Sequence, residues 1–221
     1  MKYQHSLNSN EVFEYPLGKI VCVGRNYADH ARELNNPIPS EPILFIKPAT
    51  AAVAMAESFR VPSDKGACHF ETEMAVLIGQ TLTNACHAEA KVAVAGVGLA
   101  FDLTLRELQQ KLKDKGHPWE KAKAFDGSCP LSPFVKPEAV ADLQNLQLRL
   151  TRNGELKQDG NTGQMLTGVV DLLVYMSRFF TLEPGDVVLT GTPAGVGPIQ
   201  AGDVLRAELV GLLSLETHVT S

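Results

Sequence analysis

Short apolar runs closed by proline, glycine or a charged residue constrain the fold of this chain more than any other feature. Residues 19–24 (KIVCVG), 43–47 (ILFIK) and 75–79 (AVLIG) each contain four consecutive apolar residues and then stop. Runs of this length between such residues are typical of buried strands and too short for most helices. We therefore expect the chain to fold around β-sheets.

Helical spacing occurs in three places. Residues 27–35 predict a short helix with Asn26 as its N-cap, residues 105–116 predict a second helix that closes at Gly116, and residues 162–180 predict a third. Strand runs outnumber these helices, and most are joined by turns. We therefore predict an α+β fold dominated by mixed β-structure, and not a doubly wound α/β sheet.

Turn residues divide the rest of the chain. Asn153-Gly154 predicts a β-hairpin over residues 146–158. The tripeptide Gly-Asp-Val occurs at 185–187 and again at 202–204, where two similar turns are each expected to begin a strand. Residues 92–104 are compatible with a strand or, in their first part, with a helix. Residues 117–133 show no period and are predicted to form a long functional loop.

Composition limits the class of protein. Of 221 residues, 44% are hydrophobic and 20% are charged, which is typical of a globular chain and favours one domain. Lys and Arg total 20 against 25 Asp and Glu, so the basic excess that a nucleic-acid partner requires is absent. No apolar run approaches the roughly 18 residues of a membrane span, and the first residues do not resemble a secretory signal, so we expect a cytoplasmic protein with no membrane partner. The four cysteines (Cys22, Cys68, Cys86, Cys129) form no C-x-x-C pair, which argues for reduced thiols.

The sequence His69-Phe70-Glu71-Thr72-Glu73 is the sharpest chemical signal. On a strand, His69, Glu71 and Glu73 share one face, where two adjacent carboxylates are costly unless a cation neutralises them. Asp102 lies between the apolar run 97–101 and a predicted helix. Three such carboxylates suit Mg²⁺ or Mn²⁺ better than zinc. The alternative is that both glutamates lie on a solvated strand face and that Asp102 caps the helix.

Other candidates are weaker on spacing alone. His30 and Glu33 are three residues apart on a predicted helix, so they form either a general base oriented by a carboxylate or an ordinary surface pair. Lys47 ends an apolar strand, from which it reaches the surface or aims a cation into a cleft. Residues 187–197 (VVLTGTPAGVG) match no phosphate-loop pattern, although a tight loop there could bind a small anion.

Six motifs in order resemble the fumarylacetoacetate hydrolase family, and in particular its short members with acylpyruvate hydrolase and oxaloacetate decarboxylase activity. They are GRNYADHARE, EPILFIKPATA, HFETEMAVLIG, FDLTLRELQQ, KGHPWEKAKAFDGSCPLSPFV and VVLTGTPAGVGP, and the resemblance extends from residue 19 to about residue 210. It implies a mixed β-roll or β-sandwich and a homodimer. Residues 1–18 are then an N-terminal arm and residues 19–221 a single catalytic domain.

The resemblance also implies roles for individual residues. Glu71, Glu73 and Asp102 would be the Mg²⁺ or Mn²⁺ ligands, with His30 and Glu33 as the water-activating pair and Lys123 as a cation near the reacting carbonyl. The implied substrate-binding residues are Arg25, Lys47, Arg106, Gln109 and Thr192.

The expected function is therefore a metal-dependent hydrolase that cleaves the C–C bond of acylpyruvates, which are 2,4-diketo acids, to pyruvate and a carboxylic acid. Decarboxylation of oxaloacetate is chemically adjacent, because both reactions pass through the enolate of pyruvate. The alternatives are an isomerase, tautomerase or decarboxylase of 2-oxo acids in aromatic catabolism, and a non-catalytic module that binds oxo acids. The identities of the products distinguish the enzymes from one another.

Overall fold

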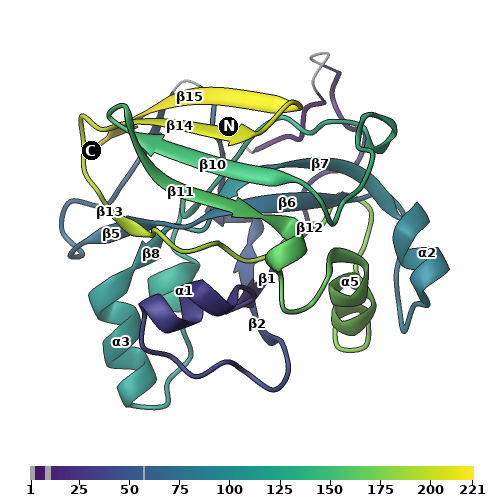
Figure 1. Ribbon diagram of the computed structural model, residues 1–221, viewed down its shortest axis with the longest axis horizontal. Coiled ribbons are helices and arrows are strands. Elements are labelled where there is room, and N and C mark those ends of the chain that lie inside the picture. Colours follow the sequence, from purple (N-terminus) through teal and green to yellow (C-terminus); the bar gives the residue numbers. More distant parts are fainter. Residues whose placement is uncertain (1–2, 8–10, 57) are drawn as a thin grey trace.

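The computed structural model describes residues 3–7, 11–56 and 58–221, and in this part of the chain three β-sheets form the body of the molecule (Figure 1). A seven-stranded sheet has the order β2-β1-β12-β6-β7-β9-β3, a five-stranded sheet the order β11-β10-β14-β15-β4, and a three-stranded sheet the order β13-β5-β8. Parallel pairs such as β1 with β12 occur beside antiparallel ones such as β6 with β7. The predicted α+β fold with mixed sheets is confirmed.

The bounds of the elements are as follows. The strands are β1 (Lys19–Gly24), β2 (Ile43–Pro48), β3 (Ala52–Ala54), β4 (Ser58–Arg60), β5 (Cys68–Phe70), β6 (Thr72–Ile78), β7 (Val94–Phe101), β8 (Thr104–Leu105), β9 (Cys129–Leu131), β10 (Gln147–Arg152), β11 (Glu155–Asn161), β12 (Val187–Leu189), β13 (Gly197–Ile199), β14 (Val204–Leu209) and β15 (Leu213–Thr220). The α-helices are α1 (Ala28–Glu33), α2 (His87–Val92), α3 (Arg106–Asp114), α4 (Glu120–Lys123) and α5 (Val169–Ser177).

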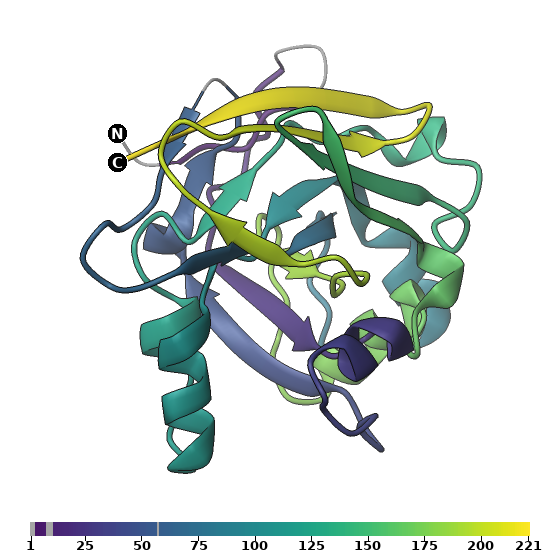
Figure 2. The same cartoon turned by 60° about the vertical axis from the view of Figure 1, so that its left-hand side comes forward.

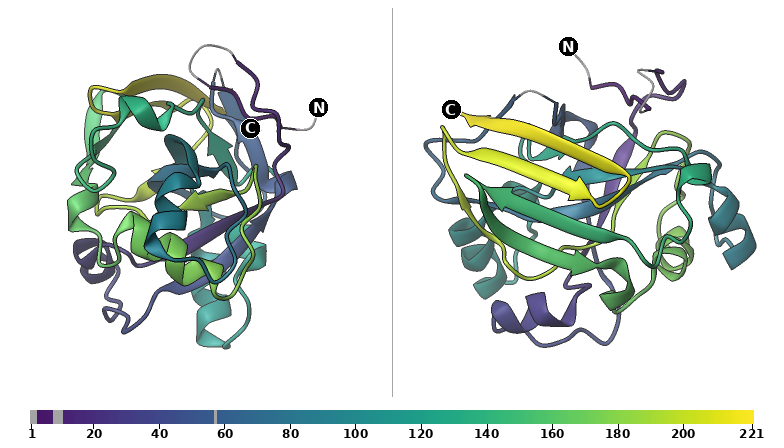
Figure 3. Two further views of the ribbon diagram at one scale, coloured as in Figure 1. Left: turned by 90° about the vertical axis from the view of Figure 1, so that its right-hand side faces the viewer. Right: turned by 45° about the horizontal axis from the view of Figure 1, so that its top comes forward.

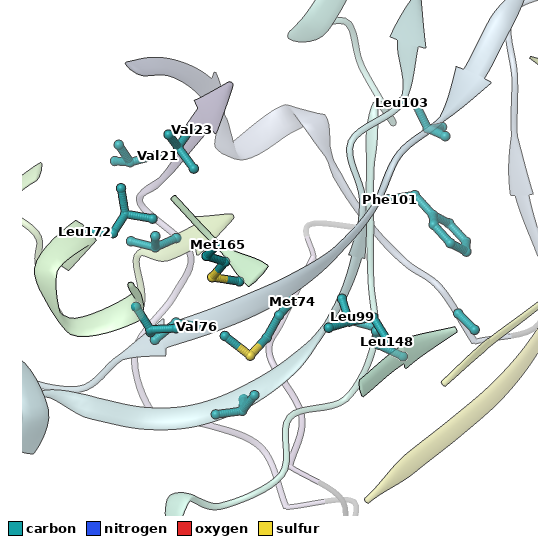
Figure 4. Close-up of a cluster of buried hydrophobic side chains, with 14 of the residues drawn as sticks. Val21, Val23, Met74, Val76, Leu99, Phe101, Leu103, Leu148, Met165 and Leu172 are labelled. Atoms are coloured by element: carbon teal, nitrogen blue, oxygen red, sulfur yellow. The ribbon is translucent and has the colours of Figure 1, made fainter. Parts of the chain in front are cut away.

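The seven-stranded sheet is covered on both faces. Every residue of β6 is buried, as expected for a strand with packed layers above and below it. Along β1, Val21 and Val23 belong to one apolar cluster while Ile20 and Cys22 belong to another, so alternate side chains fill opposite faces. Figure 4 shows the first cluster, in which residues of β1, β6 and β7 meet Leu148 of β10 and Leu172 of α5.

The helices lie outside these layers. The five-stranded sheet forms one outer face of the molecule (Figure 3, right), and α1 and α3 lie below the sheets in the views of Figures 1 and 2. Helices α2 and α5 lie at another end and contact each other. Within the described ranges, no helix is long and apolar enough to cross a bilayer. The end of the molecule that carries α1 and α3 holds the candidate site.

Two turn predictions are confirmed. Strands β10 and β11 form the predicted hairpin, with Asn153 and Gly154 at φ 53° and 81°, as the favoured two-residue turn requires. Both Gly-Asp-Val segments begin a strand through the same turn: Asp186 Oδ2 accepts the Glu183 N–H at 2.8 Å, and Asp203 Oδ2 accepts the Gln200 N–H at 3.0 Å. The repeat in the sequence therefore encodes a repeated turn.

Two predictions about elements are wrong in part, and the strand expected within residues 92–104 is confirmed. Residues 117–133 are not one loop, because they contain α4 and β9. The helix predicted over 162–180 is α-helical over Val169–Ser177 alone, since Gly168 has extended backbone and serves as the N-cap. Residues 92–104 form a strand in their centre, β7, directly after α2 ends.

The described part of the N-terminal arm packs against the sheets. His5 and Leu7 are buried, and Leu7 bridges to Phe134. His5 Nε2 lies 2.8 Å from the carbonyl oxygen of Gly185. All four cysteines are free thiols, as predicted.

Candidate functional site

Three buried carboxylates meet where β6 begins and β7 ends. Glu71 separates β5 from β6, Glu73 lies in β6, and Asp102 directly follows β7. The Asp102 N–H donates to the carbonyl oxygen of Glu71 at 2.8 Å, which aligns the two segments. One oxygen from each carboxylate lies within 4.8 Å of the others. The structure thus brings together the three residues for which the sequence suggested a metal site.

The predicted strand through residues 69–73 is interrupted at Glu71. Residues 68–70 pair with β13 and β8, whereas residues 72–78 pair with β12 and β7. His69 consequently does not line the cavity that Glu71 and Glu73 line. The expectation that all three share one face was therefore wrong for His69.

Cations neutralise two of the carboxylates. The Lys123 ammonium, at the end of α4, lies 2.7 Å from Glu71 Oε2 and 2.5 Å from Asp102 Oδ2, and Arg106 pairs with Glu71 Oε1. Burial alone lowers the pKa of Lys123, but the charges of Asp102 and Glu71 raise it above its usual value. Lys123 therefore stays protonated, and its ammonium also lies 5.2 Å from the ring centroid of Phe45.

The third carboxylate has no such partner. Among the described residues, no cation lies within ion-pair distance of Glu73, and its Oε2 accepts the Gly191 N–H at 2.6 Å. Burial and the charges of Asp102 and Glu71 raise the pKa of Glu73 well above its usual value. Burial also raises the pKa of Glu71, but Lys123 and Arg106 outweigh that effect and lower it.

This donor set fits a hard divalent cation. Asp102 Oδ1 is buried without a hydrogen-bond donor, although the Lys47 ammonium lies 2.8 Å away outside hydrogen-bond geometry. Among the described residues of this buried cluster, one carboxylate has no ion-pair partner and another has an oxygen that accepts no hydrogen bond. A bound cation would stabilise both. The donors are all oxygen atoms, which matches the preference of Mg²⁺ and Mn²⁺.

His30 and Glu33 form a pair that is built into the fold. His30 Nδ1 lies 3.2 Å from Glu33 Oε2, and His30 is buried while the Glu33 side chain is 32% exposed. Glu33 Oε1 also accepts the Gly195 N–H at 2.9 Å. The bond from Gly195 therefore holds the pair against residues 190–195. An ordinary surface pair on a helix would make no such contact with a distant loop.

The loop at residues 190–197 binds carboxylates of the chain itself. Its N–H groups at Gly191 and Gly195 donate to Glu73 and Glu33. Gly191 has φ +93°, and a Cβ there would lie 2.7 Å from Cβ of Asn26, so the position requires glycine. The small-anion loop suggested by the sequence thus has these two donors already engaged.

Asn26 is not the N-cap of α1. Tyr27 occupies that position, and the Asn26 side chain instead donates to the carbonyl oxygens of Thr167 at 3.0 Å and Thr190 at 2.9 Å. Its Oδ1 accepts the Thr167 N–H at 2.8 Å. Asn26 therefore ties the start of α1 to Thr167, which precedes α5, and to Thr190, which follows β12.

Gln158 of β11 is a residue that sequence reasoning missed. Its Nε2 donates to Thr192 Oγ1 at 2.8 Å and to the carbonyl oxygen of Pro193 at 2.9 Å, while its Oε1 accepts the Thr72 N–H at 3.0 Å. This buried amide joins residues 190–197 to the strand that carries Glu73. No local pattern distinguishes it from the other polar residues of the hairpin.

Nine of the eleven residues predicted for the site line one cavity. They are Arg25, His30, Glu71, Glu73, Asp102, Arg106, Gln109, Lys123 and Thr192. Glu33 lies behind His30, and the fully buried Lys47 contacts Asp102 and Ser128 without lining the cavity. The surface placement considered for Lys47 is therefore wrong. Sequence reasoning missed several other lining residues: Asn36, Phe45, Gln110, Lys113 and Trp119.

Comparisons with known proteins show the family. The family model described as fumarylacetoacetate (FAA) hydrolase C-terminal matches residues 19–220. The chain is 52% identical to the oxaloacetate tautomerase YcgM of Escherichia coli (strain K12), over 98% of this chain and 99% of that protein. It is 43% identical to the human mitochondrial oxaloacetate tautomerase FAHD1, over 90% of each chain.

A solved structure also matches over nearly the whole chain. The crystal structure of fumarylpyruvate hydrolase from Pseudomonas aeruginosa in complex with Mn²⁺ and pyruvate matches with a TM-score of 0.92 at 35% identity, covering 99% of this chain and 96% of that one. Both the family model and these relatives span nearly the whole chain. The chain therefore belongs to the fumarylacetoacetate hydrolase family.

Proposed function

We propose that this chain is a divalent-cation-dependent enzyme whose main reaction interconverts the keto and enol forms of oxaloacetate. The observation that carries the proposal is that His30, oriented by Glu33, lines the same cavity as three buried carboxylates. A proton-transfer group beside a cation site is what enolisation of a 2-oxo acid needs. Two similar proteins are oxaloacetate tautomerases, which is why we propose oxaloacetate as the substrate. For the same reason we place tautomerisation before the hydrolysis that the sequence motifs favoured.

Glu71, Glu73 and Asp102 would hold the cation. When bound, Mg²⁺ or Mn²⁺ supplies positive charge that orients the C1 carboxylate and the C2 oxygen of the substrate and polarises the carbonyl. Lys123 adds a second positive charge beside the cation site, since its ammonium lies within ion-pair distance of both Glu71 and Asp102. Negative charge that develops on the C2 oxygen is therefore stabilised by groups already in place.

His30 would move the proton. In the keto-to-enol direction, the imidazole takes a proton from C3 as the C2–C3 double bond forms, and the resulting imidazolium then gives that proton to the C2 oxygen. Glu33 orients the ring through Nδ1, which leaves Nε2 as the atom that can exchange the proton. No atom is gained or lost, so the product has the same formula as the substrate.

Hydrolysis of acylpyruvates is the second candidate. The same His30–Glu33 pair could deprotonate a water molecule, and attack at C4 would break the C3–C4 bond to give pyruvate enolate and a carboxylic acid. The structural match to a fumarylpyruvate hydrolase favours this reading. Decarboxylation of oxaloacetate would need the same stabilised enolate without the water.

Product analysis separates these reactions. Enol-oxaloacetate, oxaloacetate at equilibrium and acetylpyruvate are each incubated with Mg²⁺-loaded protein. Absorbance then follows the enol, while mass spectrometry follows CO₂, pyruvate and acetate. We expect the protein to accelerate decay of the enol well beyond its spontaneous rate. This decay should also be faster than the appearance of CO₂, pyruvate or acetate. Rapid release of acetate and pyruvate with no acceleration of enol decay would replace the proposal by the hydrolase.

We propose further that residues 19–221 form one catalytic domain and that the protein works as a homodimer in the cytoplasm. The family model supports the domain, since it matches residues 19–220. Sedimentation of the purified protein tests the dimer, and cell fractionation tests the compartment.

A further inference from the structure

Among the described residues, two cations that line the cavity differ from the others there in having no carboxylate partner. Lys123 and Arg106 each pair with a carboxylate. Lys113 of α3 and Arg25, which follows β1, line the same cavity and are half-buried. Within the described residues, neither of them lies within ion-pair distance of a carboxylate.

Lys113 is directed by a neutral group. Its ammonium donates to Asn36 Oδ1 at 2.9 Å, across from α3 to the segment that follows α1. An ammonium has three donors, so this bond leaves two for another acceptor. Burial and the positive charges of Arg25 and Arg106 lower the pKa of Lys113, and Asp114 acts in the opposite direction. The positive charges of Arg25, Arg106 and Lys113 thus lie close together, and the negative charge of Asp114 does not offset their effect on the pKa of Lys113.

Arg25 shows a further irregularity. Its φ is +61°, in the left-handed region that disfavours residues with a side chain. In the part of the chain that the structure describes, its guanidinium makes no hydrogen bond. An unpaired guanidinium on a strained backbone, close to a second cation, is an arrangement that a bound anion would stabilise.

We propose that Lys113 and Arg25 form a subsite for the distal carboxylate of a short 2-oxo dicarboxylic acid. The inference rests on the proposed function, because it places the other end of that acid at the three buried carboxylates and their cation. It also sets a specificity: the enzyme prefers an acid that ends in a carboxylate to one that ends in a methyl group. Oxaloacetate and pyruvate differ by this one carboxylate.

Malate and lactate test the subsite without any reaction. Both are 2-hydroxy acids with the same metal-binding end, and malate carries the extra carboxylate. Binding of each to Mg²⁺-loaded protein is measured by calorimetry for the wild type, Lys113→Met, Arg25→Met and Lys111→Met. Lys111 lies on the same helix and is exposed, so its substitution is the matched control for loss of one positive charge.

We expect the wild type and the Lys111 variant to bind malate more tightly than lactate. Lys113→Met should reduce the affinity for malate about tenfold, the size of one charge-assisted hydrogen bond, and leave lactate unchanged. Arg25→Met should act in the same direction. Equal losses for both acids would show that Lys113 only holds α3 against Asn36, and would overturn the subsite, as would no loss for either. Because binding alone is measured, absence of tautomerase activity would reject the proposed function without deciding this test.

Discussion

At the scale of single residues, Glu73 carries the charge that the fold compensates least. Its carboxylate is buried beside Glu71 and Asp102 and has no cation within ion-pair distance among the described residues. Glu73→Gln removes this repulsion but also removes one charged ligand. We predict that, in excess chelator, the variant has a free energy of unfolding equal to or above that of the wild type, while its affinity for Mg²⁺ is lower.

Glu71→Gln is the matched comparison. It breaks the ion pairs of Glu71 with Lys123 and Arg106, so that Lys123 keeps only Asp102 and Arg106 loses its carboxylate partner. We expect this to cost about 3 kcal/mol of unfolding free energy. Urea unfolding in chelator measures both variants, and calorimetry measures Mg²⁺ binding. Equal destabilisation by the two substitutions, or unchanged Mg²⁺ affinity in the Glu73 variant, would contradict this view of the cluster.

The sequence could reveal residues whose partners are near in the chain. Glu71 and Glu73 are two positions apart, and His30 and Glu33 are three apart, so both pairs could be predicted from spacing. Asn26 contacts residues more than 140 positions away, and Gln158 joins segments 34 and 86 positions away. Contacts of that range depend on the assembled sheets, which is why the role of Asn26 was predicted wrongly and Gln158 was missed.

At the scale of elements, strands with strong local patterns were predicted correctly, and those that depend on pairing were not. Strand β1 has four consecutive apolar residues that fill two clusters. Strand β9 has three residues, and it forms because β3 and β7 pair with it. The helix predicted from residue 162 begins late because Asn161 caps a separate 3₁₀ turn and Gly168 precedes α5 in extended conformation.

The N-terminal arm gives a prediction for pH dependence. Burial lowers the pKa of His5 below its usual 6.5, although Gly185 and Asp186 partly oppose this effect. The folded protein then binds fewer protons than the unfolded chain, so the free energy of unfolding falls as pH drops below about 6.5. His5→Gln should remove part of that fall, and His117→Gln, at an exposed position, should leave it unchanged. Urea unfolding from pH 5 to 8 checks this, and identical pH profiles for the wild type and the His5 variant would show that the arm contributes no such linkage.

At the scale of the whole molecule, the site joins parts that are distant in sequence. These are α1 with its proton-transfer pair, the start of β6 and the end of β7 with the carboxylates, and α4 with Lys123. Glu33→Gln tests how these parts share the work. It should slow tautomerisation by about 10²-fold or more, the low end for a general base, and slow decarboxylation of oxaloacetate less, because loss of CO₂ needs no base. Both rates are measured on one Mg²⁺-loaded preparation. Equal losses would mean that the pair acts through the loop at Gly195, which also binds Glu33.

The measurement that tests the central claim most directly is the rate of enol-oxaloacetate decay during stepwise addition of Mg²⁺ to chelator-treated protein. The account predicts that decay starts at the spontaneous rate and rises until one ion is bound per chain, and that Asp102→Asn protein shows no such rise. Full acceleration in excess chelator, or an unchanged response in the Asp102 variant, would show that the three buried carboxylates do not hold the cation on which the reaction depends.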